Sequence, residues 1–474
     1  MTTFYPGCCG LPIDRRSFLV GAGAAMAAAL PVAWWGWRGD RQHEPAPTRF
    51  SGKTTEVKRP RYAMPGPFPG RVIEVRDPTA VRPDHSIDAD VVRRMVQRGM
   101  CELTGADDAV EAWRRFFEKD DIVGIKVNPV GRKRRKDPKE VGSISSPELL
   151  LEIVAGLKSA GVPPRNIIVF ERYANEFREA GYEKVMRSRP MDGVRWHASA
   201  SAYDHFQVDI EGYDKRGRRY DFDRHVVGYD PDVFVEMGFA QPDHDPKDDR
   251  RFRSHLSLIV TKMVNKIITI PVLKDHRSAG VTLALKNMSH GFNNNVARSH
   301  ISTIYRLDHR TSNPNQCNTF IPLAAGQEPI RQKATLHIMD GLIGVYEGGP
   351  GSWNRTWSTW HRQSLFFATD PVALDHVGWD IIDAKRAEMG WPGVAQMGLI
   401  HLPKALSARL TPLAAKQLAE ALALLPPGTR QTGIPDTEQF DRRQPEHVIL
   451  AETIGLGVFN AAAIEHRQIR VTHT

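Results

Sequence analysis

Ionisable and strongly polar side chains stand where the apolar runs of this 474-residue chain end. In chain order they are Lys126 and Asn128, Glu171 and Arg172, Lys274 with Asp275 and His276, Asp340, and Asp370. In an open parallel sheet, ligands bind beyond the carboxyl ends of the strands, so we expect these side chains to converge on one crevice. The sequence therefore predicts a site rich in lysine and imidazole at one edge of a sheet.

Three of these side chains are candidates for catalysis: His276, Lys274 and Asp340. His276 is the expected proton-transfer group, because an imidazole titrates near neutral pH. Lys274 would neutralise an anion beside it. Asp340 and Asp370 would orient the histidine or hold a metal ion.

A second set of side chains is expected to bind the ligand. Lys126 lies inside an apolar run, where a lysine must reach solvent or meet an anion. A helix capped by Ser278 would place Thr282, Lys286 and His290 at i, i+4 spacing, with its first amides facing the crevice. An ordinary helix with a polar outer face explains the same spacing. The predicted binding group for a cofactor or substrate anion is Lys126, Asn128, Thr282, Lys286 and Asn287.

Metal and redox centres are constrained by the few suitable ligands. Imidazole with carboxylate suits zinc, iron or manganese, so His290, His300 and Asp370 are candidates for a divalent metal whose identity stays open. Asp370 is equally explained as the cap of a helix that begins at Pro371. Beyond the N-terminal segment only Cys101 and Cys317 remain, too few for a four-thiolate iron–sulfur cluster. One disulfide or two free thiols fit equally well.

The elements that must position these groups alternate between strand and helix. Continuous apolar runs at 121–128, 166–171, 266–272, 334–340 and 364–370 are typical of strands that are covered on both faces. A helix at 145–161, with Ser146 as its cap, would join the first two strands as a parallel pair. We expect an α/β fold with a mostly parallel central sheet, helices on both faces, and late strands at 447–460.

The predicted organisation has a targeting segment, a linker and one interrupted α/β domain. The ranges are 1–40 for an export signal or anchor, 41–65 for a linker, 66–171 and 256–474 for the two parts of the domain, and 172–255 for a charged insertion. Arg15 and Arg16 precede an uncharged run at 18–37, which resembles a twin-arginine export signal. We therefore expect the twin-arginine translocase as a partner and an extracytoplasmic location, with a retained membrane anchor as the alternative.

Several blocks resemble, in order, those of the domain-of-unknown-function family 362. They include VGIKVN, KIITIPVLKDHRSAGVTLALKNMSHG and FFATDPVALDHVGWD, between about Asp121 and Asp383. Some members of that family are joined to iron–sulfur modules, so the resemblance implies redox chemistry, although this chain lacks the cysteines of those modules. The similarity assigns no reaction to the motif residues.

The leading hypothesis is an exported enzyme that binds an anionic substrate or a phosphate-bearing cofactor. The alternatives are a non-catalytic extracytoplasmic binding protein and a metal-dependent hydrolase. A net charge of +9 suits a small anionic ligand, and no nucleic-acid-binding motif accompanies it, so nucleic acid is not an expected partner.

Overall fold

The computed structural model describes residues 62–133, 140–203, 223–236, 253–296, 299, 317–354, 356–395 and 445–471. The predicted export signal at 1–40 and most of the linker at 41–65 lie outside these residues. In the described ranges, no helix combines the length and the apolar character that a membrane crossing requires.

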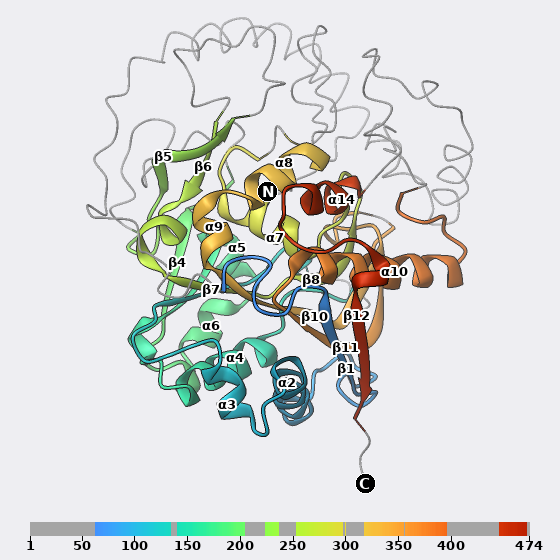
Figure 1. Cartoon of the computed structure of the whole chain (residues 1–474), viewed down its shortest axis with the longest axis horizontal. Helices are drawn as coiled ribbons and strands as arrows, with labels where there is room; N and C mark the ends of the chain where they lie inside the picture. The colour runs from blue at the N-terminus through green and yellow to red at the C-terminus, as the bar shows by residue number, and fades with distance from the viewer. Residues whose placement is uncertain are drawn as a thin grey trace, which may run out of the picture.

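A mixed ten-stranded sheet forms the centre of the described part of the chain (Figure 1). Its order is β12-β1-β11-β10-β7-β2-β3-β4, with β8 paired to β10 and β9 paired to β8. The strands are β1 (Arg71–Arg76), β2 (Val123–Lys126), β3 (Ile167–Tyr173), β4 (Arg195–Ala200), β7 (Lys266–Thr269), β8 (Val272–His276), β9 (Gly280–Val281), β10 (Ala334–Glu347), β11 (Ser358–Ala368) and β12 (Glu465–Arg470). The run from β10 to β4 is parallel, which confirms the predicted mostly parallel α/β fold.

Alternate side chains of the strands face two separate hydrophobic cores. On one face, Ile125 and Val169 pack with α2 (Ala89–Thr104), α3 (Ala109–Arg114), α4 (Pro147–Ser159), α5 (Ala174–Glu179) and α6 (Tyr182–Met186). On the other face, Ile168 and Phe170 pack with α7 (Leu283–Phe292), α8 (Cys317–Ala325), α9 (Glu328–Lys333), α10 (Pro371–Glu388) and α14 (Glu446–Thr453). Helices thus cover both faces, as the continuous apolar strands require.

The order of the parallel strands reverses beside β2. From β2 the chain moves outward to β3 and then β4, and it returns to β7 on the opposite side of β2. In doubly wound sheets such a reversal opens a crevice at the carboxyl ends of the two central strands. The fold therefore provides a ligand position beyond the ends of β2 and β7.

The structure differs from the expected strand directions at β11. This strand is antiparallel to both β10 and β1, so its carboxyl end lies beside the first half of β10, with Ala368 opposite His337. Asp370, which follows β11, is consequently carried to the sheet edge opposite the crevice. The expected convergence of all these strand ends on one site is therefore wrong for Asp370.

The predicted boundaries of the insertion also differ from those observed. β4 lies within 172–255 but belongs to the main sheet, where it pairs with β3. β5 (Tyr229–Glu236) and β6 (Arg253–Ser257) form a separate antiparallel pair. The sequence did not indicate β4, because its six residues, RWHASA, contain no long apolar run and charge-dense segments follow them.

Two predicted elements have another structure. The helix expected to begin at Ser278 begins at Leu283, because Gly280 has φ +75° and Gly280–Val281 instead pair with β8. The late strands expected at 447–460 are replaced by α14, in which His447, Val448 and Ala451 are buried at helical spacing.

Candidate functional site

A small pocket of about 40 Å³ lies beyond the ends of β2 and β3 and beside α7. Among the side chains named from the sequence, it brings together Lys126, Asn128, Glu171, Arg172, His276, Thr282, Lys286, Asn287 and His290. Three of these are basic side chains, from Lys126, Arg172 and Lys286, and one is a carboxylate, so basic groups predominate in the lining. The pocket lies at the carboxyl end of β2, beside the switch point between β2 and β7, and its other strand residues come from β3 and β8.

A larger groove of about 750 Å³ lies beside α10 and β12 and contains none of those side chains. Its cations are largely neutralised within the groove wall. Arg362 and His466 both bind the buried Glu74, and Lys385 lies 2.6 Å from Glu388. We therefore regard the smaller pocket as the better candidate, because its charges converge where the fold places a ligand.

A buried ion pair between Lys126 and Glu171 forms one side of the pocket. Their exposed fractions are 1% and 4%. The Lys126 Nζ also donates to the Val127 carbonyl at 2.7 Å and lies 3.5 Å from Asn287 Oδ1. Burial lowers the pKa of Lys126, although Glu171 opposes this shift, and burial raises the pKa of Glu171 against the effect of Lys126.

Gly291 allows this lysine to lie against α7. A Cβ atom at position 291 would stand 2.7 Å from Lys126 Cε and 2.9 Å from its Nζ. Arg172 fastens the same end of the helix, because its guanidinium donates to the His290 carbonyl at 2.5 Å. The end of α7 is thus fitted closely to β2 and β3.

Lys274 approaches the pocket from β8 and is fully buried. Its Nζ donates to Asn128 Oδ1 at 3.1 Å and to the Val130 carbonyl. Asn128 is itself held by Ser145, whose hydroxyl accepts the Asn128 N–H at 2.8 Å. Lys274 therefore does not line the cavity. It holds in place Asn128, which does.

His276 is held in one ring orientation by its own turn. Its Nδ1 accepts the backbone N–H groups of Ser278 at 3.0 Å and Ala279 at 3.1 Å. A ring nitrogen that accepts two N–H groups carries no hydrogen, so the hydrogen lies on Nε2. This geometry favours a fixed hydrogen-bond donor over the proton-transfer group that we expected from the sequence.

Lys286 and His290 of α7, together with Thr282 directly before the helix, line the pocket at the spacing that the sequence indicates. The start of the helix is not open to a ligand, however. The amides of Ala284 and Leu285 donate to Asp375 at 2.7 and 2.9 Å. The expected anion site at this helix start is thus occupied by a carboxylate of the chain itself.

Asn287 presents a hydrogen-bond donor that no described residue accepts. Its side chain is 4% exposed and lines the pocket, and its Nδ2 is buried without a hydrogen-bond partner in the described part of the chain. Its Oδ1 faces Lys126, which fixes the direction of the amide. A buried donor left unsatisfied is unfavourable, so this atom indicates where a ligand acceptor would bind.

Asp340 and Asp370 stabilise helix starts rather than the pocket. Asp340 accepts the N–H and hydroxyl of Ser146 at 2.8 and 2.6 Å, next to α4. Asp370 accepts two amides at the start of α10 and one each from Gly70 and Val458. Burial raises the pKa of Asp340, and it raises that of Asp370 to about 6. Within the described residues, neither carboxylate hydrogen-bonds to His276.

The metal candidates do not form a ligand cluster in the described part of the chain. His290 Nε2 lies 2.9 Å from the Ser299 hydroxyl, and His300 lies outside the described residues. No group of three or more His, Cys, Asp or Glu side chains suited to a metal occurs among the described residues. Cys101 and Cys317 do not form a disulfide with each other.

Comparison with known proteins places these residues inside one family region. A family model described as Domain of unknown function (DUF362) matches residues 123–380, which is more than half of the chain and includes every residue that lines the pocket. No curated protein matches the chain.

Proposed function

The chain belongs to the family described as Domain of unknown function (DUF362), and from its pocket we propose that it is an enzyme acting on a small oxyanion. The anion would be a carboxylate, phosphate or sulfate, bound at the switch point of the sheet. Lys126 and Glu171 would exchange a proton with the bound molecule.

The observation that carries this proposal is that the pocket offers hydrogen-bond donors. Asn287 Nδ2 is buried without an acceptor among the described residues, and the side chains of His276 and Lys286 line the same pocket with an imidazole and an ammonium group. The oxygens of a deprotonated oxyanion only accept hydrogen bonds, so such a ligand matches a pocket that presents donors. The hydroxyl groups of a neutral polyol also donate, and they would need acceptors in the pocket. The excess of cations over carboxylates favours a negative ligand further.

The volume of the pocket supports a ligand of few atoms. One water needs about 10–15 Å³ of this kind of space. A pocket of about 40 Å³ therefore accommodates a small oxyanion or the charged end of a longer molecule.

The Lys126–Glu171 pair supports acid–base chemistry. Burial moves the two pKa values toward each other, so a proton passes between the two groups at a smaller free-energy difference than in water. Perturbed pKa values beside a ligand pocket are typical of groups that transfer protons. In this proposal Asn287 and His276 hold the oxyanion, while Lys126 and Glu171 act on a neighbouring atom.

Binding is tested by isothermal titration calorimetry of the full chain with phosphate, sulfate and short carboxylates, and by mass spectrometry of any co-purified molecule. Lys286→Met removes a charge-assisted hydrogen bond and should weaken binding about tenfold or more. Lys119→Met removes an exposed lysine elsewhere and serves as the matched control. Equal affinities for the two variants, or the absence of any bound oxyanion, would refute the proposal.

Catalysis is separated from simple capture by isotope exchange. With a short carboxylate as the ligand, we expect a hydrogen on its carbon chain to be replaced by deuterium from D₂O when the wild-type chain is present, and mass spectrometry measures this uptake. Glu171→Gln should stop the exchange while binding persists. Binding without exchange in the wild type would instead identify a non-catalytic binding protein.

We further propose that the chain is exported by the twin-arginine route. The support is the pair Arg15–Arg16 before the uncharged run at 18–37, which lies outside the described residues. Retention of that run as a membrane anchor is the alternative outcome.

A further inference from the structure

The pocket is lined by two kinds of side chain. Polar side chains come mainly from β2, β3 and α7, and they include the amide of Asn287 and the ammonium group of Lys286. Val130 and Pro350, in contrast, have side chains without a polar atom. A ligand that fills the pocket must therefore contact both hydrogen-bonding groups and hydrocarbon.

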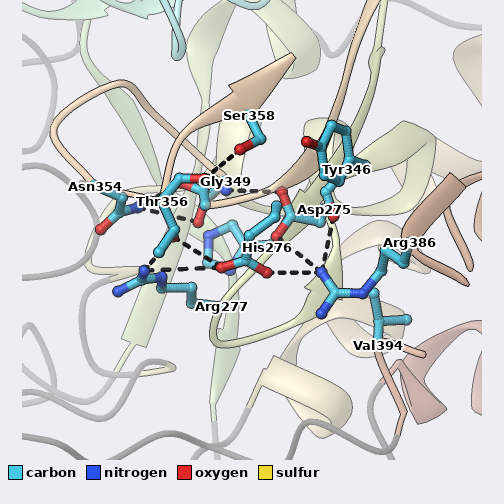
Figure 2. Close-up of polar contacts among 12 residues, drawn as sticks. Asp275, His276, Arg277, Tyr346, Gly349, Asn354, Thr356, Ser358, Arg386 and Val394 are labelled. Atoms are coloured by element: carbon cyan, nitrogen blue, oxygen red, sulfur yellow. Dashed lines mark hydrogen bonds and ion pairs between the residues drawn. The ribbon is translucent and has the colours of Figure 1, made fainter. Parts of the chain in front are cut away.

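Pro350 is held in place through the residue before it, Gly349. As Figure 2 shows, Asp275 is directed toward Gly349, and its Oδ1 accepts the Gly349 N–H at 2.7 Å. The Arg277 N–H donates to the Gly349 carbonyl at 3.4 Å. A side chain at position 349 would collide with β8, because a Cβ atom there would stand 1.9 Å from the Asp275 carbonyl oxygen. The two residues that flank His276 in the chain thus fix the loop that carries Pro350.

A buried cluster of charged groups supports this loop. The Asp275 Oδ2 lies 3.9 Å from the Arg386 guanidinium, which also donates to Glu347 at 2.8 Å. Asn354 donates to the Gly349 carbonyl at 3.2 Å. Both polar groups of Gly349 are therefore bonded within the chain and are not available to a ligand.

Val130 is fixed in a similar way in the loop after β2. Its N–H donates to Asn128 Oδ1 at 3.1 Å, and its carbonyl accepts the ammonium group of Lys274. Because both backbone groups are engaged, the side chain of Val130 is the part that a ligand can contact. The pocket thus combines hydrogen-bond donors from α7 with apolar side chains that the chain holds in place.

We propose that the ligand is a short aliphatic carboxylate, and that Val130 and Pro350 receive its carbon chain. This inference rests on the proposed function and narrows it to one class of oxyanion. A carboxylate has two oxygens at one end, which would face Asn287 and Lys286, and hydrocarbon at the other end. Phosphate and sulfate carry oxygens on every side. Some of those oxygens would be buried against Val130 or Pro350 without a hydrogen bond, which is unfavourable.

The volume of the pocket limits the length of the carbon chain. About 40 Å³ corresponds to about three water-sized groups, which is room for a carboxylate with roughly one or two further carbons. Each buried methylene should strengthen binding about three- to fourfold, until the chain meets the ring of Pro350. The affinity should therefore pass through a maximum at acetate or propionate.

Isothermal titration calorimetry of the full chain with formate, acetate, propionate, butyrate, phosphate and sulfate tests this inference. We expect acetate or propionate to bind about tenfold more tightly than either inorganic ion. Pro350→Ala removes part of the apolar wall and should move the maximum to a carboxylate about one carbon longer. Val130→Thr should lower the preference for propionate over phosphate, because a hydroxyl group can bond to an additional oxygen.

Pro83→Ala is the matched control, because Pro83 is exposed and does not line the pocket, and it should keep the wild-type order of affinities. Phosphate or sulfate bound at least as tightly as every carboxylate would contradict this inference and leave the proposed function intact. An unchanged order of affinities in Pro350→Ala would also overturn it. If Pro350→Ala does not fold, the wild-type series and Val130→Thr decide. A chain that binds none of these ions would overturn the proposed function and this inference together.

Discussion

At the scale of single residues, buried carboxylates in this fold fall into two kinds. Asp340, Asp370 and Asp375 accept amides at the starts of α4, α10 and α7, where the helix dipole favours a negative charge. Glu171 instead pairs with Lys126 at the pocket. In the sequence, the carboxylates at helix starts and the carboxylate at the pocket have the same appearance, because each follows an apolar run. This explains why Asp340 and Asp370 were named as site residues.

The site residues that local spacing could identify were those of α7. Thr282, Lys286 and His290 share a helix face, and the structure brings all three to the pocket. Gly291 and Pro350 were missed, because their contributions depend on close contact with segments distant in the chain. A glycine directly after the helix-face residues was the available signal for a close approach.

We expect Lys126→Met to lower the free energy of unfolding by about 3–5 kcal/mol, because it leaves Glu171 buried without its cation. Glu171→Gln should cost a similar amount, about 3 kcal/mol. The double variant should lose less than the sum, since neither charge then remains buried alone. Urea unfolding of the four proteins measures the difference, and strictly additive losses would show that the two groups are not coupled.

At the scale of elements, the start of α7 is determined by groups that are remote in sequence. Ser278 is a good capping residue and made an early start plausible. Gly280, with φ +75°, turns the chain into β9, and Asp375 of α10 receives the first free amides of α7. A local pattern contains neither the register of β8 with β9 nor the position of α10.

Asp375→Ala tests that assignment. The change leaves the amides of Ala284 and Leu285 buried without an acceptor, which should cost about 2 kcal/mol or more and speed hydrogen exchange at 283–288. Asp380→Ala is the matched control on the same helix, because Asp380 is 72% exposed. The control should change stability by less than about 0.5 kcal/mol. Equal effects of the two substitutions would contradict the role of Asp375.

At the scale of the whole molecule, the fold class followed from the continuous apolar strands, but the order of the strands did not. Periodicity shows that a strand is covered on both faces and says nothing of which strand lies beside it. The positions of β4 in the main sheet and of β11 antiparallel to its neighbours therefore had to come from the structure. The position of the pocket at the end of β2, beside β3, depends on this strand order and could not be predicted from the sequence either.

The export proposal makes a prediction for the full chain. Replacing Arg15 and Arg16 together by lysine should abolish passage through the twin-arginine translocase, because that signal is read as a pair of arginines. Cell fractionation and immunoblotting should then find the variant inside the cytoplasm and the wild type outside it. Identical distributions of the two proteins would exclude this route.

The pairing of β1 has a consequence for the timing of biosynthesis. β1 lies between β11 and β12, and Arg71 is paired with Glu465, which the ribosome adds 394 residues later. Such distant pairing gives a high contact order, so this side of the molecule closes only after most of the polypeptide has been made. Until then β1 lacks its strand partners, and an unpaired strand edge is prone to pair with other chains. The proposed twin-arginine route transports folded proteins, and it would suit a chain whose folding is completed only after synthesis of its last strand.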